Sequence, residues 1–241
     1  MKILGIIPAR FGSTRFEGKP LALINGKMMI QRVFEQARKA TKLADVVVAT
    51  DDERIVHAVE GFGGKAVMTS ADHKSGTDRC REVVEKIGRD FDAVINIQGD
   101  EPYINPLQIN QIAELISDDD TPLASLCKPI KDEDELKSPN AVKVVFDKNG
   151  KALYFSRFAI PYLRNKVEHI YYKHIGIYAY KCDVLKEVAA LPQSGLELAE
   201  SLEQLRWLEN GYTVRMGVTE FESYSVDVPD DILKIEKVFK E

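Results

Sequence analysis

The stretch Ile6-Ile7-Pro8-Ala9-Arg10-Phe11-Gly12-Ser13-Thr14-Arg15-Phe16-Glu17-Gly18-Lys19-Pro20 carries an apolar strand directly into a loop with three cations. The cations are Arg10, Arg15 and Lys19, and glycines and small hydroxyl side chains stand between them. Such a composition lets backbone N–H groups approach phosphate oxygens closely. An isolated loop of this kind could also be a group of solvated surface cations. The loop predicts a triphosphate site, which the rest of the chain must support.

The composition indicates an ordinary globular protein. The 241 residues carry a formal net charge of −5, so the basic loop indicates a local site and not a diffuse nucleic-acid surface. The three cysteines, Cys80, Cys127 and Cys182, are far apart, which favours reduced thiols and a cytoplasmic protein. The N-terminal apolar run is interrupted by Pro8 and Arg10, as in a core strand and unlike a secretory signal. No stretch approaches the length of a membrane span.

Strand and helix patterns alternate over the first hundred residues. Strands are expected at 2–8, 45–50, 65–68 and 93–98, and helices around 30–37, 55–59 and 83–87. This rhythm is typical of an α/β fold with a mostly parallel sheet and helices on both faces. Ligands of such sheets bind beyond the carboxyl ends of the strands. The Arg10 loop, Asp51 and the corner Gln98-Gly99-Asp100 are therefore expected on one rim.

After residue 120 the pattern changes to strands without long helices between them. Strands are expected at 142–146, 152–155 and 171–180, and helices at 182–191, 200–210 and around 232–239. Asp147-Lys148-Asn149-Gly150 has the composition of a hairpin turn, and Gly211 is a plausible helix stop. We interpret residues 1–241 as one domain, with an inserted antiparallel lobe at about 122–180.

Two carboxylates are candidates for a magnesium site. Asp100 follows an apolar strand, and the flexible Gly99 allows a turn that exposes it at the sheet edge. Mg²⁺ usually takes one or two carboxylates together with substrate phosphates and water. Asp227, just before the last expected helix, is the best second candidate, and a helix N-cap explains it equally well.

The segment Asp72-His73-Lys74-Ser75-Gly76-Thr77-Asp78-Arg79 stands between a strand and a helix. Its hydroxyls could cap the helix, which is the default, or bind a ribose and a base. The four histidines are dispersed, which argues against a zinc cluster or an acyl-enzyme triad. The glycines at 61–64 follow a helix and lack Walker spacing, and no GxGxxG motif is present.

Together these motifs resemble the 3-deoxy-manno-octulosonate (Kdo) cytidylyltransferases, the CMP-Kdo synthetases of bacterial lipopolysaccharide synthesis. The resemblance covers nearly the whole chain. Its blocks are Ile7–Arg10, Ser13–Arg15, Gly18–Pro20, Val48–Asp51, His73–Arg79, Gln98–Pro102, Asn140–Val145, Ala152–Arg157, His174–Tyr178 and Leu202–Arg206. The first loop would also fit sialic acid cytidylyltransferases, and the later blocks favour the Kdo family.

The resemblance implies that CTP and Kdo react, with Mg²⁺, to give CMP-Kdo and diphosphate. It implies a Rossmann-like nucleotidyltransferase fold, related to glycosyltransferase A, whose inserted lobe helps to form a homodimer. No nucleic-acid or membrane partner is expected. The implied catalytic residues are Arg10, Lys19 and Asp100, and the implied metal ligands are Asp100 and Asp227. The implied nucleotide-binding residues are Pro8, Ala9, Arg10, Ser13, Thr14, Arg15, Lys19, His73, Ser75, Gly76, Gln98 and Asp100. The implied sugar-binding residues are Gln98, Arg157, His174, Tyr178, Glu203 and Gln204, with Arg157 as a natural carboxylate partner.

Two departures from the family pattern concern this site. Glu17 stands where the family commonly has proline, and the stretch between Pro161 and His174 is shorter than in many relatives. The alternatives are a cytidylyltransferase for 8-amino-Kdo or sialic acid, and a nucleotide-binding module without turnover.

Overall fold

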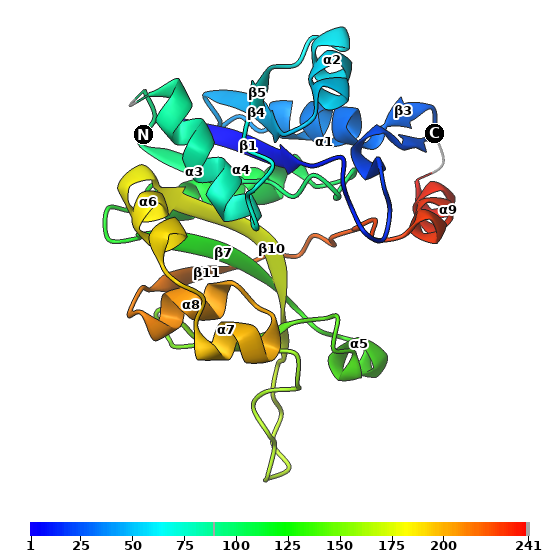
Figure 1. Cartoon of the computed structure of the whole chain (residues 1–241). Helices are drawn as coiled ribbons and strands as arrows, with labels where there is room; N and C mark the ends of the chain where they lie inside the picture. Colours follow the sequence, from blue (N-terminus) through cyan, green and yellow to red (C-terminus); the bar gives the residue numbers. More distant parts are fainter. Residues whose placement is uncertain (89, 240–241) are drawn as a thin grey trace.

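The structure is a computed structural model that describes residues 1–88 and 90–239. One sheet of nine strands organises the chain (Figure 1). Its strands are β1 (Ile3–Ala9), β4 (Asp45–Thr50), β5 (Ala66–Met68), β6 (Ala93–Asn96), β7 (Leu123–Pro129), β8 (Lys143–Phe146), β9 (Ala152–Ser156), β10 (Tyr172–Lys181) and β11 (Val214–Val218). A separate short hairpin is formed by β2 (Leu23–Ile24) and β3 (Lys27–Met28).

The main path of the sheet has the order β11-β7-β10-β6-β1-β4-β5. β1 pairs in parallel with β4 and β6, β4 with β5, and β7 with β11. Only β10 runs against its neighbours along this path of the described chain. The expected α/β fold with a mainly parallel central sheet is confirmed.

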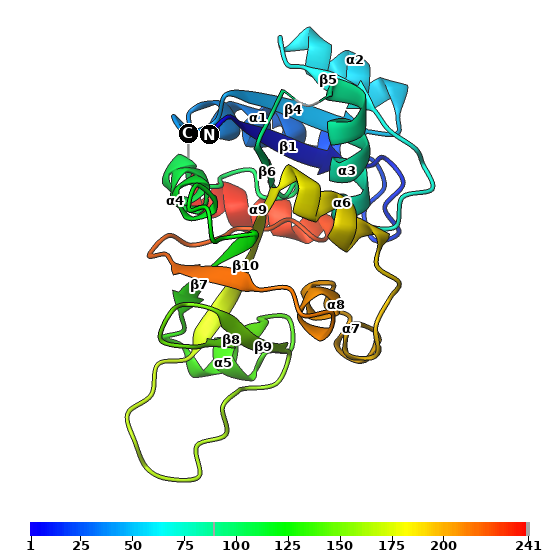
Figure 2. The same ribbon diagram turned by 90° about the vertical axis from the view of Figure 1, so that its left-hand side faces the viewer.

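Helices cover both faces of this sheet (Figures 1 and 2). They are α1 (Met29–Arg38), α2 (Glu53–Gly61), α3 (Gly76–Ile87), α4 (Pro106–Ile116), α5 (Glu133–Lys137), α6 (Cys182–Ala190), α7 (Gly195–Glu200), α8 (Gln204–Glu209) and α9 (Pro229–Val238). Side chains of β1 alternate between the faces, so Ile3 and Ile7 pack with α1, α2 and α4, and Leu4 and Ile6 pack with α3, α6 and α8. Among the described residues, no helix is both long and apolar enough to cross a membrane.

The lobe is built on the antiparallel hairpin of β8 and β9, which joins the sheet through β10. Its turn is the expected one: the Asp147 side chain accepts hydrogen bonds from the N–H groups of Asn149 and Lys151, both at 2.8 Å, and Gly150 has a φ of +75°. The lobe was expected at about 122–180, but β7 and much of β10, at its two ends, belong to the main sheet. The part of the lobe that projects from the sheet is therefore the chain between β7 and β10. In both views the connection from β9 to β10 extends farthest from the sheet (Figures 1 and 2).

The helix expected at 200–210 differs from the one observed. Ser201 has a φ of +52° and ends α7, and α8 begins only at Gln204. Gly211, with a φ of +83°, follows the end of α8 as expected. The backbone reversal at Ser201 places Glu203 at the start of a new helix.

Candidate active site

The cation-rich loop leaves the sheet at the end of β1 and folds back on itself. The carbonyl of Phe11 accepts hydrogen bonds from the N–H groups of Ser13 and Gly18, both at 3.0 Å. Gly18 has a φ of +68°, and a Cβ atom there would lie 3.2 Å from the Phe11 ring. Both constraints favour glycine. Lys19 then begins the short 3-10 helix η1 (Lys19–Leu21), which fixes where its side chain starts.

Two of the loop cations face the two predicted metal ligands. Lys19 Nζ lies 2.7 Å from Asp100 Oδ2 and also donates to the carbonyl of Val226 at 2.9 Å. Arg15 Nη2 lies 2.9 Å from Asp227 Oδ1. The N–H of Val226 donates to the carbonyl of Asp100 at 2.9 Å, so the segment before α9 is attached directly to the corner after β6. Sequence positions more than a hundred residues apart therefore form one charged cluster.

The corner after β6 approaches β1 very closely. A Cβ atom at Gly99 would lie 2.5 Å from the carbonyl oxygen of Pro8, which no ordinary contact allows. Glycine at this position lets the chain turn against β1 and carry Asp100 to the rim. The sharp turn predicted at Gly99 is confirmed.

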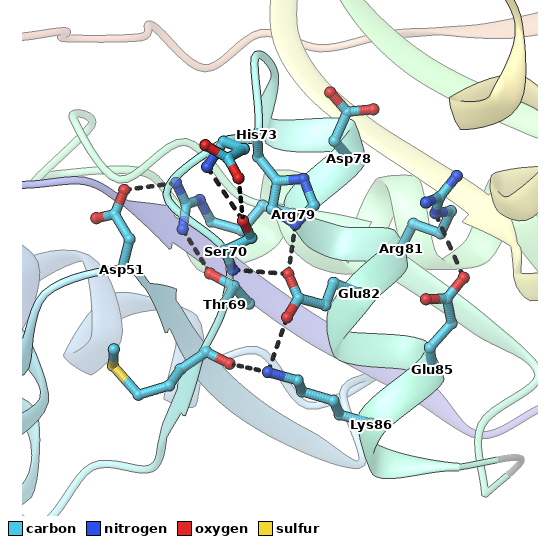
Figure 3. A network of polar contacts seen from close by, with 12 residues as sticks. Asp51, Thr69, Ser70, His73, Asp78, Arg79, Arg81, Glu82, Glu85 and Lys86 are labelled. Atoms are coloured by element: carbon cyan, nitrogen blue, oxygen red, sulfur yellow. Dashed lines mark hydrogen bonds and ion pairs between the residues drawn. The ribbon is translucent and has the colours of Figure 1, made fainter.

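The start of α3 supplies another wall of the site. Ser75 caps the helix, because its hydroxyl accepts a hydrogen bond from the N–H of Asp78 at 3.1 Å. Arg79 is buried and donates to Asp51 Oδ2 at 3.0 Å and to the hydroxyl of Thr69 (Figure 3). The capping role expected for this segment is confirmed. Capping uses the acceptor capacity of Ser75 and leaves its O–H group able to donate.

These elements enclose a cavity of about 440 Å³ beyond the carboxyl ends of β1 and β6. It is lined by Pro8, Ala9, Arg10, Ser13, Thr14, Arg15, Lys19, Pro20, His73, Lys74, Ser75, Gly76, Arg79, Asn96, Gln98, Gly99, Asp100, Tyr178, Glu203 and Asp227. Every residue predicted to bind the nucleotide or the metal is in this set. Arg10 is exposed, and no ion pair joins it to another described residue. Glu17 is also exposed and does not line the cavity.

The predicted sugar-binding residues divide into two groups. Gln98, Tyr178 and Glu203 line the cavity, and Arg157, His174 and Gln204 do not. The guanidinium of Arg157 donates to the backbone carbonyls of Pro139 at 2.9 Å and of Glu200 at 2.7 Å.

His174 is partly buried beside Ser125, with 2.8 Å between its Nε2 and the serine hydroxyl, and desolvation lowers its pKa to about 3. Gln204 is buried, at the start of α8. The roles of Arg157, His174 and Gln204 toward the sugar stay predictions.

Glu203 has the most unusual environment of the predicted sugar-binding residues that line the cavity. Burial raises its pKa, against the opposing effect of Arg206 and of hydrogen bonds from the hydroxyls of Ser75 and Thr77. Thr77 Oγ1 donates to Glu203 Oε2 at 3.1 Å, and the other carboxyl oxygen has no partner among the described residues. A buried acceptor with free capacity favours a site for a ligand hydroxyl or a proton.

The carboxylates fit a magnesium ion that is shared with a substrate. The described residues contain no cluster of three or more His, Cys, Asp or Glu that could hold a metal without further ligands. Asp100 and Asp227 nevertheless line the same cavity as the loop cations. Mg²⁺ commonly takes one or two carboxylates and completes its shell with phosphate oxygens and water.

Five of the cavity residues were not assigned to the site from the sequence: Pro20, Lys74, Arg79, Asn96 and Gly99. Two of them, Asn96 and Arg79, are buried polar residues. Asn96 ends β6 as a polar residue in an otherwise apolar strand, and its carboxamide oxygen is buried without a partner among the described residues. Arg79 is the fourth residue of α3 and pairs with Asp51. This pairing could not be predicted without the fold, because it joins two different segments. The polar interruption at Asn96 was the only usable signal in the sequence.

The comparisons with known proteins agree with this geometry. A family model described as "Cytidylyltransferase" matches residues 4–221. The 3-deoxy-manno-octulosonate cytidylyltransferase of Bacteroides thetaiotaomicron is 56% identical, over 100% of this chain and 99% of the relative. The chain belongs to the 3-deoxy-manno-octulosonate cytidylyltransferase family. The 8-amino-3,8-dideoxy-manno-octulosonate cytidylyltransferase of Shewanella halifaxensis is 51% identical, over 96% of both chains.

Solved structures support the same assignment. A CMP:2-keto-3-deoxy-manno-octonic acid synthetase complexed with CTP matches with a TM-score of 0.94 and 46% identity, over 99% of this chain and 98% of that one. A cytidylyltransferase from Leptospira borgpetersenii, at 14% identity and a TM-score of 0.66, shares the fold. The predicted family and nucleotidyltransferase class are confirmed.

Proposed function

We infer that this protein transfers the cytidylyl group of CTP to Kdo and releases diphosphate, a reaction that supplies lipopolysaccharide synthesis. One observation carries this conclusion: a single cavity is lined by the cation-rich loop, the start of α3 and the Asp100 corner. The predicted sugar-binding residues Tyr178 and Glu203 line the same cavity. The family assignment gives the substrates. CTP is the activated donor, and Kdo is the sugar acid that accepts the cytidylyl group.

The reaction needs positioning and charge neutralisation more than covalent chemistry. The 2-hydroxyl of Kdo attacks the α-phosphorus in line with the departing diphosphate. Arg10, Arg15 and Lys19 line the cavity, where they would neutralise the negative charge that accumulates on that leaving group. No enzyme nucleophile is required, because the sugar hydroxyl is itself the acceptor.

Mg²⁺ is the proposed cofactor, held by Asp100 and Asp227. The presence of both carboxylates at the triphosphate loop supports this assignment. When bound, the ion would neutralise phosphate charge and lower the pKa of a coordinated hydroxyl. Lys19 and Arg15 hold the two carboxylates at the cavity and would exchange part of this pairing for phosphate oxygens.

Which sugar acid the protein prefers is a separate question from which reaction it catalyses. The relative from Shewanella halifaxensis is named for 8-amino-3,8-dideoxy-manno-octulosonate, and it is 51% identical to this chain. The 8-amino sugar is therefore the second candidate substrate, ahead of sialic acid. Relative kcat/KM values with the three sugars decide between them.

A homodimer formed through the lobe is the proposed assembly. The connection between β9 and β10 exposes large apolar side chains: Phe158 is 83% exposed, Tyr162 88%, Val167 60% and Ile170 57%. Several large apolar side chains exposed on one connection favour a protein interface. Light scattering on the eluted protein should give twice the chain mass, and a monomer would contradict the proposal.

The free cysteines favour a cytoplasmic location, which fractionation of the native host checks.

The deciding experiment is diphosphate release from CTP and Mg²⁺ with Kdo, 8-amino-Kdo or sialic acid, and without sugar. Release that depends on Kdo, with CMP-Kdo as product, supports the proposal. Preference for another sugar would change the substrate and keep the chemistry. Tight CTP binding without release in any mixture would indicate a nucleotide-binding module.

A further inference from the structure

Three hydrogen bonds converge on the carboxylate of Glu82 in the second turn of α3 (Figure 3). Glu82 Oε2 accepts from the N–H of Ser70 at 2.8 Å and contacts His73 Nε2, and Glu82 Oε1 lies 2.7 Å from Lys86 Nζ. Burial opposes ionisation of Glu82, but the bonds from Lys86, Ser70 and His73 outweigh it and lower the pKa to about 2. Glu82 is therefore an ionised acceptor at neutral pH.

This environment determines which nitrogen of a neutral His73 ring carries the proton. A carboxylate can only accept hydrogen bonds, so Nε2 of His73 must be the donor in the contact with Glu82. In the neutral ring, Nδ1 is then an acceptor. The ring makes no other hydrogen bond within residues 1–88 and 90–239. Its second nitrogen points away from Glu82 (Figure 3).

The position of His73 restricts what this acceptor can meet. His73 lines the cavity next to Ser75 and Gly76, on the segment before α3, and its side chain is 16% exposed. The phosphate-binding cations come from a different segment, the loop after β1. Phosphate oxygens are themselves acceptors and would repel an unprotonated Nδ1. A donor on the nucleoside, either the 4-amino group of cytosine or a ribose hydroxyl, has the complementary chemistry.

We propose that Glu82 is a positioning residue: it fixes His73 with the proton on Nε2 and thereby presents Nδ1 as an acceptor to a donor group of the bound nucleoside. The identity of the nucleotide rests on the proposed function. The proposed hydrogen bond itself is testable by CTP binding alone, without turnover.

The first test compares Glu82→Leu with Glu85→Leu. Glu85 is the matched control, because it lies on the same helix and its one ion pair among the described residues is with Arg81, at 3.3 Å. Loss of one hydrogen bond of ordinary strength should raise the KM for CTP roughly 3- to 10-fold. The kcat and the KM for Kdo should stay within about twofold of wild type for both variants. Glu82→Gln keeps an acceptor oxygen and should restore most of the CTP affinity.

A double-mutant cycle separates positioning from a purely structural role. If Glu82 acts through His73, then Glu82→Leu should have no further effect on CTP affinity in a His73→Ala background. An equal loss in both backgrounds would overturn the proposal, because Glu82 would then act independently of the imidazole. Thermal unfolding of each variant verifies that the proteins compared are folded.

Calorimetry with CTP, UTP and 2′- and 3′-deoxy-CTP identifies the donor. If the 4-amino group is the donor, His73→Ala should reduce the preference for CTP over UTP. If a ribose hydroxyl is the donor, His73→Ala should instead reduce the preference for CTP over the deoxy-CTP that lacks this hydroxyl. Unchanged ratios for all analogues would refute the proposal. Nitrogen-15 NMR of the imidazole gives an independent signature: wild type should show an unprotonated Nδ1, and a protonated Nδ1 at neutral pH would also refute it. If CTP binds as described and no sugar is activated, the proposed function fails and this inference stands.

Discussion

Asp100→Asn separates the structural contribution of the acidic corner from its chemical one. The side chains of Lys19 and Asp100 are 16% and 28% exposed, so their ion pair at 2.7 Å is partly screened by solvent. Pairs of this kind contribute about 0.2–1 kcal/mol, and asparagine keeps an oxygen that Lys19 can still contact. The expected cost in stability is therefore below about 1 kcal/mol, which lowers the Tm of a chain of this size by no more than about 2–4 °C.

The loss of activity should be far larger than the loss of stability. A neutral amide removes a full negative charge from the proposed Mg²⁺ site, where such a charge is worth several kcal/mol in the transition state. We expect kcat/KM for diphosphate release to fall about 1000-fold, which corresponds to about 4 kcal/mol. Calorimetric unfolding and a diphosphate assay over a range of Mg²⁺ concentrations measure both quantities. Near wild-type activity at saturating Mg²⁺, or a Tm more than about 10 °C lower, would refute the assignment.

Two further changes test other parts of the site. Arg157→Ala should raise the KM for Kdo more than the KM for CTP, because arginine is a carboxylate partner; equal effects would show that its bonds to backbone carbonyls are its main role. Gly99→Ala places a Cβ atom 2.5 Å from the Pro8 carbonyl, so it should displace the corner and lower kcat/KM at least about tenfold; unchanged kinetics would contradict that account.

Burial opposes ionisation of Glu222, but hydrogen bonds from two lysines outweigh it and lower its pKa from 4.5 to about 2. Its stabilisation is thus complete above about pH 4.5 and is lost as the pH falls toward 2. Glu222→Gln should make stability less dependent on pH in that range, and denaturation at graded pH measures this; an unchanged slope would exclude the effect.

The nucleotide side of the site was predictable because its residues are local in sequence. The loop from Arg10 to Lys19 directly follows a strand, and the Gln98-Gly99-Asp100 corner follows another, so strand order alone brings them to one rim. The hairpin at Asp147–Gly150 was likewise predictable, since its turn depends on a few adjacent residues. Local patterns were sufficient for these features.

Other features depend on contacts that a single segment does not contain. β7 and β11 were not predicted, although they pair in parallel in the main sheet. The break at Ser201 has a left-handed backbone at a non-glycine residue, which no propensity favours. Arg157, His174 and Gln204 were assigned to the sugar by resemblance and lie outside the cavity. Their distance from a bound sugar depends on how the lobe and α7 pack, which no single segment encodes.

Asp227 shows how a distant residue becomes part of the site. Val226, the residue before it, is fully buried against Ile24, Met29 and Ile235, which anchors the segment between β11 and α9. The side chain of Asp231, on α9, then accepts hydrogen bonds from the N–H groups of Asp227 and Val228 at 3.0 and 3.1 Å. Because both the hydrophobic anchor and the helix cap lie outside the cavity, the second carboxylate is positioned by the C-terminal helix and not by the sheet. The N-cap interpretation of Asp227 is wrong, because Val228 occupies the N-cap position of α9 and its N–H donates to Asp231. The Asp227 carboxylate instead lines the cavity beside Arg15, where the proposed magnesium ion would need it.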